Sequence, residues 1–253
     1  MNTSRLHWSL LLAIGSTLVA CDKDVEEEYD DLVDAPQANT VVAMSMSFTR
    51  GGSPFDPSVG FTDAAGTRVE LRRLKFYMSQ PVFTGDAGDT VASFPQKYLL
   101  FDLAQPGVVQ NIGEVDAHLE RMHIALGIDS VTNHSDPLTM APPLNATFMW
   151  WGWATGHLFL LMEGKYDSTG DGVVDNADGE FTFHCGMDTM YTPTQFVVDT
   201  DADMGGNVIL PFTLRIDSLF SQLDVAADPS VMVVHPTTLA LMQRLKAGLT
   251  PNP

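Results

Sequence analysis

Tryptophan and histidine side chains gather in one stretch of the sequence. Three of the four tryptophans are Trp150, Trp151 and Trp153, and they lie between His134 and His157. On a strand, Trp151 and Trp153 would point to one face and Trp150 to the other. Imidazole nitrogens bind both common oxidation states of copper, and indole rings can be oxidised, so this stretch is a candidate copper or redox site. The alternative is that the indoles simply pack in the core.

The tryptophans belong to a longer series of motifs. N-H-S-D-P at residues 133–137, M-W-W-G-W at residues 149–153 and F-T-F-H at residues 181–184 follow one another along the chain. Three segments precede them, namely L-R-R-L-K-F-Y-M-S (71–79), L-F-D-L (100–103) and H-I-A-L-G-I-D (123–129). In this order, over roughly residues 41–190, the motifs resemble the MbnP-like copper-binding family, which is one half of the metallo-mystery pair.

The resemblance implies a function in copper storage, carriage or acquisition. It implies an extracytoplasmic, β-rich protein whose tryptophan is converted to kynurenine by a partner, a MauG-like dihaem cytochrome c peroxidase. The protein is then a binding protein and a substrate of that partner, not an enzyme. Carried onto this sequence, the copper ligands are His134 and His184, with Trp151 or Trp153 as the kynurenine precursor.

Other histidines and a cysteine lie near these motifs. His123 and His157 stand where relatives are expected to carry aromatic residues, so they are either local substitutions or additional copper ligands. Cys185 directly follows His184, and adjacent side chains on a strand face opposite ways, so we expect Cys185 to point away from the copper. His118 lies in a polar stretch, and we expect it to be a surface residue.

A second metal site is suggested by an acidic loop at residues 167–178. The spacing is typical of a calcium loop, with side-chain oxygens at positions 1, 3, 5, 9 and 12 and a backbone carbonyl at position 7. The ligands would be Asp167, Thr169, Asp171, Val173, Asp175 and Asp178. The shorter Asp178 replaces the usual glutamate, and the flanking segments read as strands. The alternative is therefore an acidic, solvated hairpin loop.

The N-terminus has the features of a lipoprotein signal. Residues 1–20 contain Arg5, an apolar run at residues 10–14 and then small residues, which is the order of a secretory signal peptide. The end of the segment, L-V-A-C at residues 18–21, resembles a lipobox, so we expect Cys21 to carry a lipid anchor. The protein would then be held to a membrane, facing the periplasm or the cell surface. Residues 21–38 are expected to form an acidic, flexible tether before a copper-binding domain at residues 39–253.

The pattern from residue 41 onward predicts a mainly β fold, a two-sheet β-sandwich with a short C-terminal helix. Met44, Met46 and Phe48 alternate with polar residues, as on a half-buried strand. Further strands or strand pairs are predicted at residues 69–82, 97–103, 120–128, 147–163, 179–184, 195–199 and 207–216. Helices are predicted at residues 112–119 and 237–249.

Composition limits the remaining function classes. The 253 residues are 45% hydrophobic and carry a net charge of -19, so a packed core is expected and nucleic acid is not the partner. No G-x-S-x-G or H-E-x-x-H motif supports a hydrolase. The alternative to copper binding is a calcium-stabilised surface adhesin or carbohydrate-binding sandwich, in which Trp151 and Trp153 stack on sugar rings.

Overall fold

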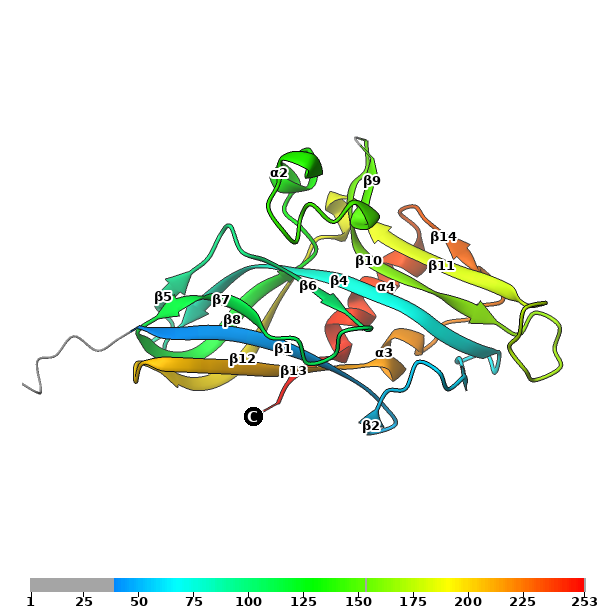
Figure 1. The fold of residues 1–253 in the computed structure, drawn as a ribbon, viewed down its shortest axis with the longest axis horizontal. Helices are drawn as coiled ribbons and strands as arrows, with labels where there is room; N and C mark the ends of the chain where they lie inside the picture. The colour runs from blue at the N-terminus through cyan, green and yellow to red at the C-terminus, as the bar shows by residue number, and fades with distance from the viewer. Residues whose placement is uncertain (1–38, 153, 253) are drawn as a thin grey trace, which may run out of the picture. The chain divides into compact units, whose positions relative to one another are not determined.

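Residues 39–152 and 154–252 are described by a computed structural model, in which two β-sheets pack on each other (Figure 1). The smaller sheet has the order β15-β13-β1-β2, with β7 also paired to β1. Strands β1 and β13 run parallel, and the other pairs are antiparallel. These strands are β1 (Thr40–Arg50), β2 (Ser53–Pro54), β7 (Gln110–Val115), β13 (Gly206–Arg215) and β15 (Leu249–Pro251).

The larger sheet has the order β12-β8-β4-β10-β11-β14, with β3, β5 and β6 paired to β4 and β9 paired to β10. The central position of β4 and β10 means that both are bonded on two sides. The strands are β3 (Phe61–Thr62), β4 (Arg68–Thr84), β5 (Thr90–Ser93), β6 (Tyr98–Asp102), β8 (Ala117–Leu126), β9 (Trp150–Gly152), β10 (Gly156–Tyr166), β11 (Gly179–Gly186), β12 (Thr192–Ala202) and β14 (Ser230–Val231).

Helices are short and lie outside the sheets. The longest, α4 (Pro236–Gly248), begins with a capping box in which His235 and Thr238 bond each other's backbone amides. None of the described helices is long and apolar enough to cross a membrane. The others are α2 (Ser130–Asn133), α3 (Ile216–Phe220) and the 3-10 helices η1 (Pro137–Thr139), η2 (Thr147–Met149) and η3 (Asp188–Met190).

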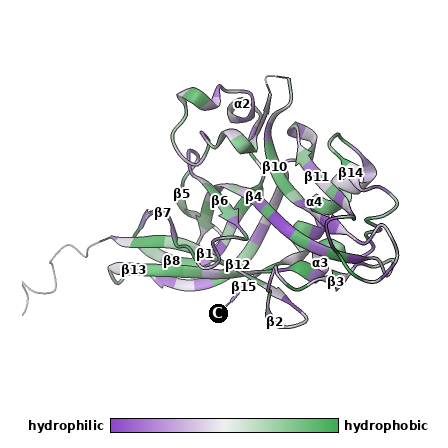
Figure 2. Cartoon of the chain, turned by 45° about the vertical axis from the view of Figure 1, so that its right-hand side comes forward, coloured by the Kyte–Doolittle hydropathy of each residue, from purple (hydrophilic) through white to green (hydrophobic). Residues whose placement is uncertain are grey.

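The larger sheet has an apolar inner face and a polar outer face over β4, β10 and β11. Phe76, Leu160 and Phe183 are fully buried on the inner face. Side chains alternate along each strand, so the adjacent residue on each strand faces outward. These residues are Lys75, Leu161 and His184, which are neighbours across the three strands. Figure 2 shows a hydrophobic stretch of β10 beside a hydrophilic stretch of β4.

The predicted two-sheet, mainly β fold is confirmed, and so is the helix at residues 237–249, which is α4. The alternation in β1 is also confirmed, with Met44, Met46 and Phe48 buried. The helix predicted at residues 112–119 is wrong, since this segment forms β7 and the start of β8. A bulge in the β1–β7 pairing shifts the register, so that Ile112 and Val115 are both buried at a spacing that imitates a helix. The expected signal peptide and tether lie outside the described residues.

Gly164 lies at a bulge in the pairing of β10 with β4 and has no room for a side chain. A Cβ there would lie 2.0 Å from the Glu70 carbonyl oxygen and 2.6 Å from the Phe181 ring. We therefore expect Gly164→Ala to lower the free energy of unfolding by about 1–3 kcal/mol, measured by urea denaturation. Thr182→Ala, on the outer face of β11, is the control and should cost less than about 1 kcal/mol. Equal effects of the two substitutions would contradict this packing.

Candidate functional site

His184 on the outer face of β11 is held by a carboxylate from the neighbouring strand. Its Nε2 lies 2.7 Å from Glu163 Oε1, and Arg73 Nη1 donates to Glu163 Oε2 at 2.6 Å. Glu163 is directly opposite Arg73 in the strand register, so β4, β10 and β11 each contribute one residue. An ionised carboxylate can only accept hydrogen bonds, which places the imidazole hydrogen on Nε2.

The other ring nitrogen of His184 is buried and unused. Nδ1 has no hydrogen-bond partner among residues 39–152 and 154–252. The ring of Trp151 packs against the ring of His184, with the two ring centroids 5.8 Å apart at an angle of 78°. Leaving a buried polar atom without a partner costs about 1–3 kcal/mol. An unpaired, buried imidazole nitrogen next to an indole is the feature that a metal ligand at this position would have.

The residues between β8 and β10 form a cover over this outer face, with α2, η2 and β9 on the same side of the sheet (Figure 1). Among the contacts that attach the cover to β4 are one hydrogen bond and one cation–aromatic contact. Tyr77 Oη donates to the Pro143 carbonyl oxygen at 2.9 Å, and Lys75 Nζ lies 4.9 Å from the centroid of the Phe148 ring. The cover thereby brings the tryptophan stretch onto the strands that carry Glu163 and His184.

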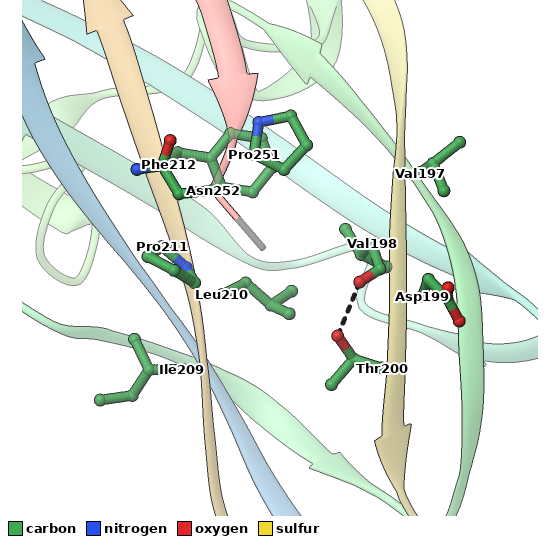
Figure 3. Close-up of a pocket in the computed structure, with 10 residues that line it drawn as sticks. All are labelled: Val197, Val198, Asp199, Thr200, Ile209, Leu210, Pro211, Phe212, Pro251 and Asn252. Atoms are coloured by element: carbon green, nitrogen blue, oxygen red, sulfur yellow. Dashed lines mark hydrogen bonds between the residues drawn. The ribbon is translucent and has the colours of Figure 1, made fainter.

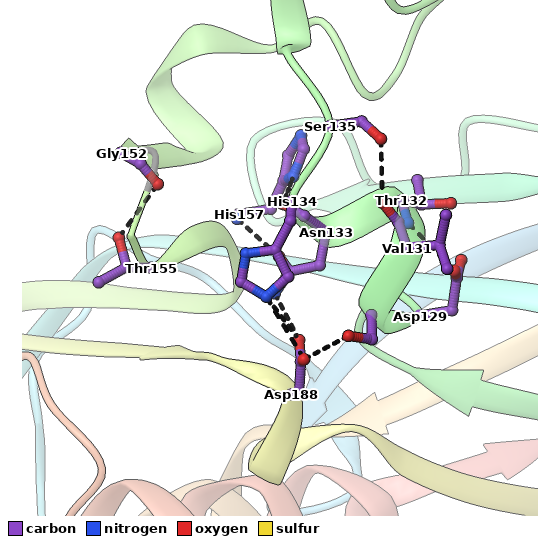
Figure 4. A network of polar contacts seen from close by, with 11 residues as sticks. Asp129, Val131, Thr132, Asn133, His134, Ser135, Gly152, Thr155, His157 and Asp188 are labelled. Atoms are coloured by element: carbon purple, nitrogen blue, oxygen red, sulfur yellow. Dashed lines mark hydrogen bonds and ion pairs between the residues drawn. The ribbon is translucent and has the colours of Figure 1, made fainter.

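A buried asparagine fastens α2 to β10 (Figure 4). Asn133 Oδ1 accepts the His157 backbone N–H at 2.7 Å, and its Nδ2 donates to Asp188 Oδ1 at 2.9 Å. Gly156 permits this approach, because it has a φ of 75° and a Cβ there would lie 2.3 Å from Asn133 Oδ1.

His134 belongs to the same network and not to the His184 pair. It is exposed, and its Nε2 lies 3.3 Å from Asp188. Burial of Asp188 raises its pKa, but hydrogen bonds from Ser130 and Asn133 and the nearby His134 outweigh this effect, so the pKa lies below its usual value. No described group of three ligand atoms within 4.8 Å of one another contains His134 or His184. The structure therefore holds the two expected copper ligands in separate polar clusters.

The additional histidines do not join His184. His157 is fully buried, and each of its ring nitrogens faces a backbone carbonyl oxygen, Nδ1 that of Asn133 at 3.2 Å and Nε2 that of Leu144 at 3.0 Å. The ring of Trp150 packs against it at 4.9 Å. His123 pairs with Val82, seven positions along β4 from the row that contains His184. That offset corresponds to roughly 20 Å.

Cys185 faces the opposite side of the sheet from His184, as expected. It is buried, and its Sγ donates to the Thr238 carbonyl oxygen in α4 at 3.5 Å. Burial raises the pKa of this thiol, so it is an unreactive core residue. Cys21 and Trp153 lie outside the described residues, and their expected roles stay predictions.

The acidic loop at residues 167–178 connects β10 to β11 and is exposed. Its carboxylates accept backbone amides of the loop itself. Asp167 accepts from Gly170 at 2.6 Å and from Gly172 at 2.7 Å, and Asp178 accepts from Asp175 at 2.8 Å. The hydrogen bond from Gly172 is the largest cause of the lowered pKa of Asp167. Calcium binding by this loop stays a prediction.

One cluster that the sequence analysis did not anticipate lies at the other end of the larger sheet. Ligand atoms of Asp86, His118 and Glu120 lie within 4.8 Å of one another. His118 Nδ1 also bonds Asp201 at 2.6 Å, and this hydrogen bond is the main cause of the raised pKa of His118. His118 and Glu120 are two residues apart on β8, but Asp86 and Asp201 come from other segments, so the spacing in the sequence does not indicate the cluster.

A cleft between the two sheets lies apart from the site at His184. It lies between β12 and β13, where Val198 and Thr200 face Leu210 and Phe212 (Figure 3). None of its lining residues comes from β10 or β11, and Asp199 is its one ionisable side chain. The cleft therefore takes no part in the site at His184.

The fold and the site define a mainly β sandwich in which a cover bearing tryptophans lies over a histidine–carboxylate pair. A sequence model of the MbnP family matches residues 39–233, and the chain therefore belongs to the MbnP family. The structure is similar to that of MbnP from Methylosinus trichosporium, with a TM-score of 0.56 and 15% sequence identity. The similarity covers 80% of this chain and 87% of that one, and at this identity it shows a shared fold. No curated protein sequence matches the chain.

The anchoring of α2 can be tested through Asn133. Asn133→Ala removes the acceptor for the buried His157 N–H, so we expect a loss of about 1–3 kcal/mol in stability. Amide hydrogen exchange should show faster exchange at His157 and in α2. Ser135→Ala removes only an exposed hydroxyl that donates to the Val131 carbonyl oxygen, and it should change neither. Unchanged protection of His157 in Asn133→Ala would contradict the assigned role.

Proposed function

We propose that this protein is an extracytoplasmic copper-binding lipoprotein in which His184 Nδ1 is a copper ligand. The observation that carries the proposal is the buried, unpartnered Nδ1 of an imidazole ring that packs against Trp151. Imidazole nitrogens suit copper, and metal-bound histidines commonly donate their second ring N–H to a carboxylate. The Glu163–Nε2 hydrogen bond has that form. Bound copper would supply a redox-active centre that satisfies the buried nitrogen.

His134 is proposed as the second ligand. Its contact with Asp188 is long at 3.3 Å, and both side chains are more than 40% exposed. Ion pairs in such positions contribute about 0–1 kcal/mol, so little stability is lost when the His134 side chain rotates away from Asp188. Asn133, in contrast, keeps α2 attached to β10 through buried hydrogen bonds. His134 can therefore change its partner while the helix beneath it stays in place.

Trp151 is proposed as the residue that becomes kynurenine. Its ring packs against His184, whereas the ring of Trp150 packs against His157, whose nitrogens both face backbone carbonyl oxygens. The conversion removes one carbon from the indole and adds one oxygen, so it needs an oxidant. A MauG-like dihaem cytochrome c peroxidase would supply the oxidising equivalents, which makes this protein its substrate.

The cellular role follows from the proposed anchor and ligands. A lipid on Cys21 would hold the copper domain at a membrane, on the periplasmic side or at the cell surface, for copper storage, carriage or acquisition. The loop at residues 167–178 directly precedes β11, so calcium there would stabilise the strand that carries His184. Separate Trp150 and Trp151 contacts with two histidines favour this function over a tryptophan platform for sugars.

The tryptophan proposal predicts a covalent change. We expect the chain co-expressed with a MauG-like dihaem partner to show, by intact mass, the loss of one carbon and gain of one oxygen, and peptide mapping should place it at Trp151. Trp151→Phe should abolish the change, and Trp150→Phe should retain it. A modification that maps to Trp150, or none in the wild type, would overturn this assignment.

The copper proposal predicts a specific loss of metal. His184→Gln should lose stoichiometric copper, because the amide cannot replace the imidazole nitrogen, while the fold measured by circular dichroism is retained. His118→Gln alters the cluster at the far end of the sheet and is the matched control. Metal analysis after dialysis distinguishes the two variants. Copper retained by His184→Gln but lost by His118→Gln would move the site to the cluster of Asp86, His118 and Glu120.

A further inference from the structure

We propose that Arg73 and Glu163 are positioning residues that fix the tautomer of His184 before any metal arrives. Glu163 holds the hydrogen on Nε2, so that Nδ1 keeps its lone pair on the ring that packs against Trp151. The inference deepens the proposed function, since the nitrogen prepared in this way is the proposed copper ligand. It concerns the metal-free protein, however, and can be tested without copper.

The strand pairing sets the geometry of the hydrogen-bonded series Arg73–Glu163–His184. Arg73 and Glu163 are direct partners in the β4–β10 register, and His184 lies on the next strand, diagonal to Glu163. Glu163 uses one oxygen for each neighbour, Oε2 for Arg73 and Oε1 for His184, at 2.6 and 2.7 Å. Because Arg73 holds one oxygen and His184 the other, the Glu163 carboxylate has little freedom to turn away.

The chemistry of the two tautomers decides between them. With the hydrogen on Nε2, the imidazole donates a short hydrogen bond to the carboxylate, and Nδ1 keeps its lone pair. With the hydrogen on Nδ1, two acceptors, Nε2 and Glu163 Oε1, would face each other at 2.7 Å, and a buried N–H would lack an acceptor. Both effects oppose the second form.

The exposed fraction of the side chain falls from Arg73 to Glu163 to His184. The side chain of Arg73 is 48% exposed, that of Glu163 is 21% exposed and that of His184 is 14% exposed. The charge of Arg73 therefore stays in contact with solvent, while the hydrogen bond that selects the tautomer is shielded from competition by water. An exposed ion pair between Arg73 and Glu163 adds little to the stability of the fold. Arg73 does orient the Glu163 carboxylate, however, and that carboxylate bonds His184.

The test is nitrogen NMR of the copper-free, full-length protein labelled with 15N-histidine. We expect the His184 nitrogens to show the Nε2–H tautomer in the wild type and in Glu180→Gln, which removes a carboxylate from the same strand without touching His184. In Glu163→Gln, whose amide can either donate or accept, we expect a mixture of tautomers. Copper(I) affinity, measured by competition with a chromophoric chelator, should fall about 10–100-fold in Glu163→Gln and stay unchanged in Glu180→Gln.

The outcomes separate this inference from the proposed function. An Nδ1–H tautomer in the wild type, or a Glu163→Gln protein with unchanged tautomer and affinity, overturns the positioning role. An Nε2–H tautomer that depends on Glu163 supports it even if the wild type binds no copper, in which case the proposed function alone fails. Arg73→Gln frees only one oxygen of Glu163, so it should give a smaller change in the same direction. It carries the test if Glu163→Gln does not fold.

Discussion

The pairing of β10 with β4 on one side and β11 on the other determines where the charged and histidine side chains of the sheet lie. It places Glu163 opposite Arg73 and diagonal to His184, and it turns Phe76, Leu160 and Phe183 into the core. A slip of one residue in either pairing would exchange the two faces and bury the charged residues. The apolar inner face therefore sets the register, and the register sets the polar contacts of the outer face.

The cover between β8 and β10 adds what the sheet alone lacks. Strands supply a carboxylate and an imidazole, but the indole ring comes from a segment held by Asn133 and by Tyr77. His157 is part of this attachment, since its amide donates to Asn133 and its ring lies between carbonyl oxygens of the cover. A histidine that sequence alone allows as a metal ligand thus has a structural role, which leaves Trp151 next to His184.

The sequence indicated the sheets well because alternation and burial are local properties of a strand, as in Met44 and Met46 of β1. It failed at residues 112–119, where a bulge produced a helical spacing. At the site, the motifs indicated His184 and Trp151, but not Glu163. A single acidic residue near the end of an apolar strand was the available signal, and its partner depends on strand register. No local sequence pattern shows the register, so the contacts of Glu163 with Arg73 and His184 could be found only from the structure.

The most direct test of the account is a crystal structure of the copper-loaded protein with anomalous diffraction at the copper edge. We expect copper on His184 Nδ1 at a bonding distance, with Glu163 still bonded to Nε2 and Trp151, or its kynurenine product, beside the metal. Copper on His184 Nε2 with Glu163 displaced, or copper at Asp86, His118 and Glu120 with His184 unoccupied, would contradict it.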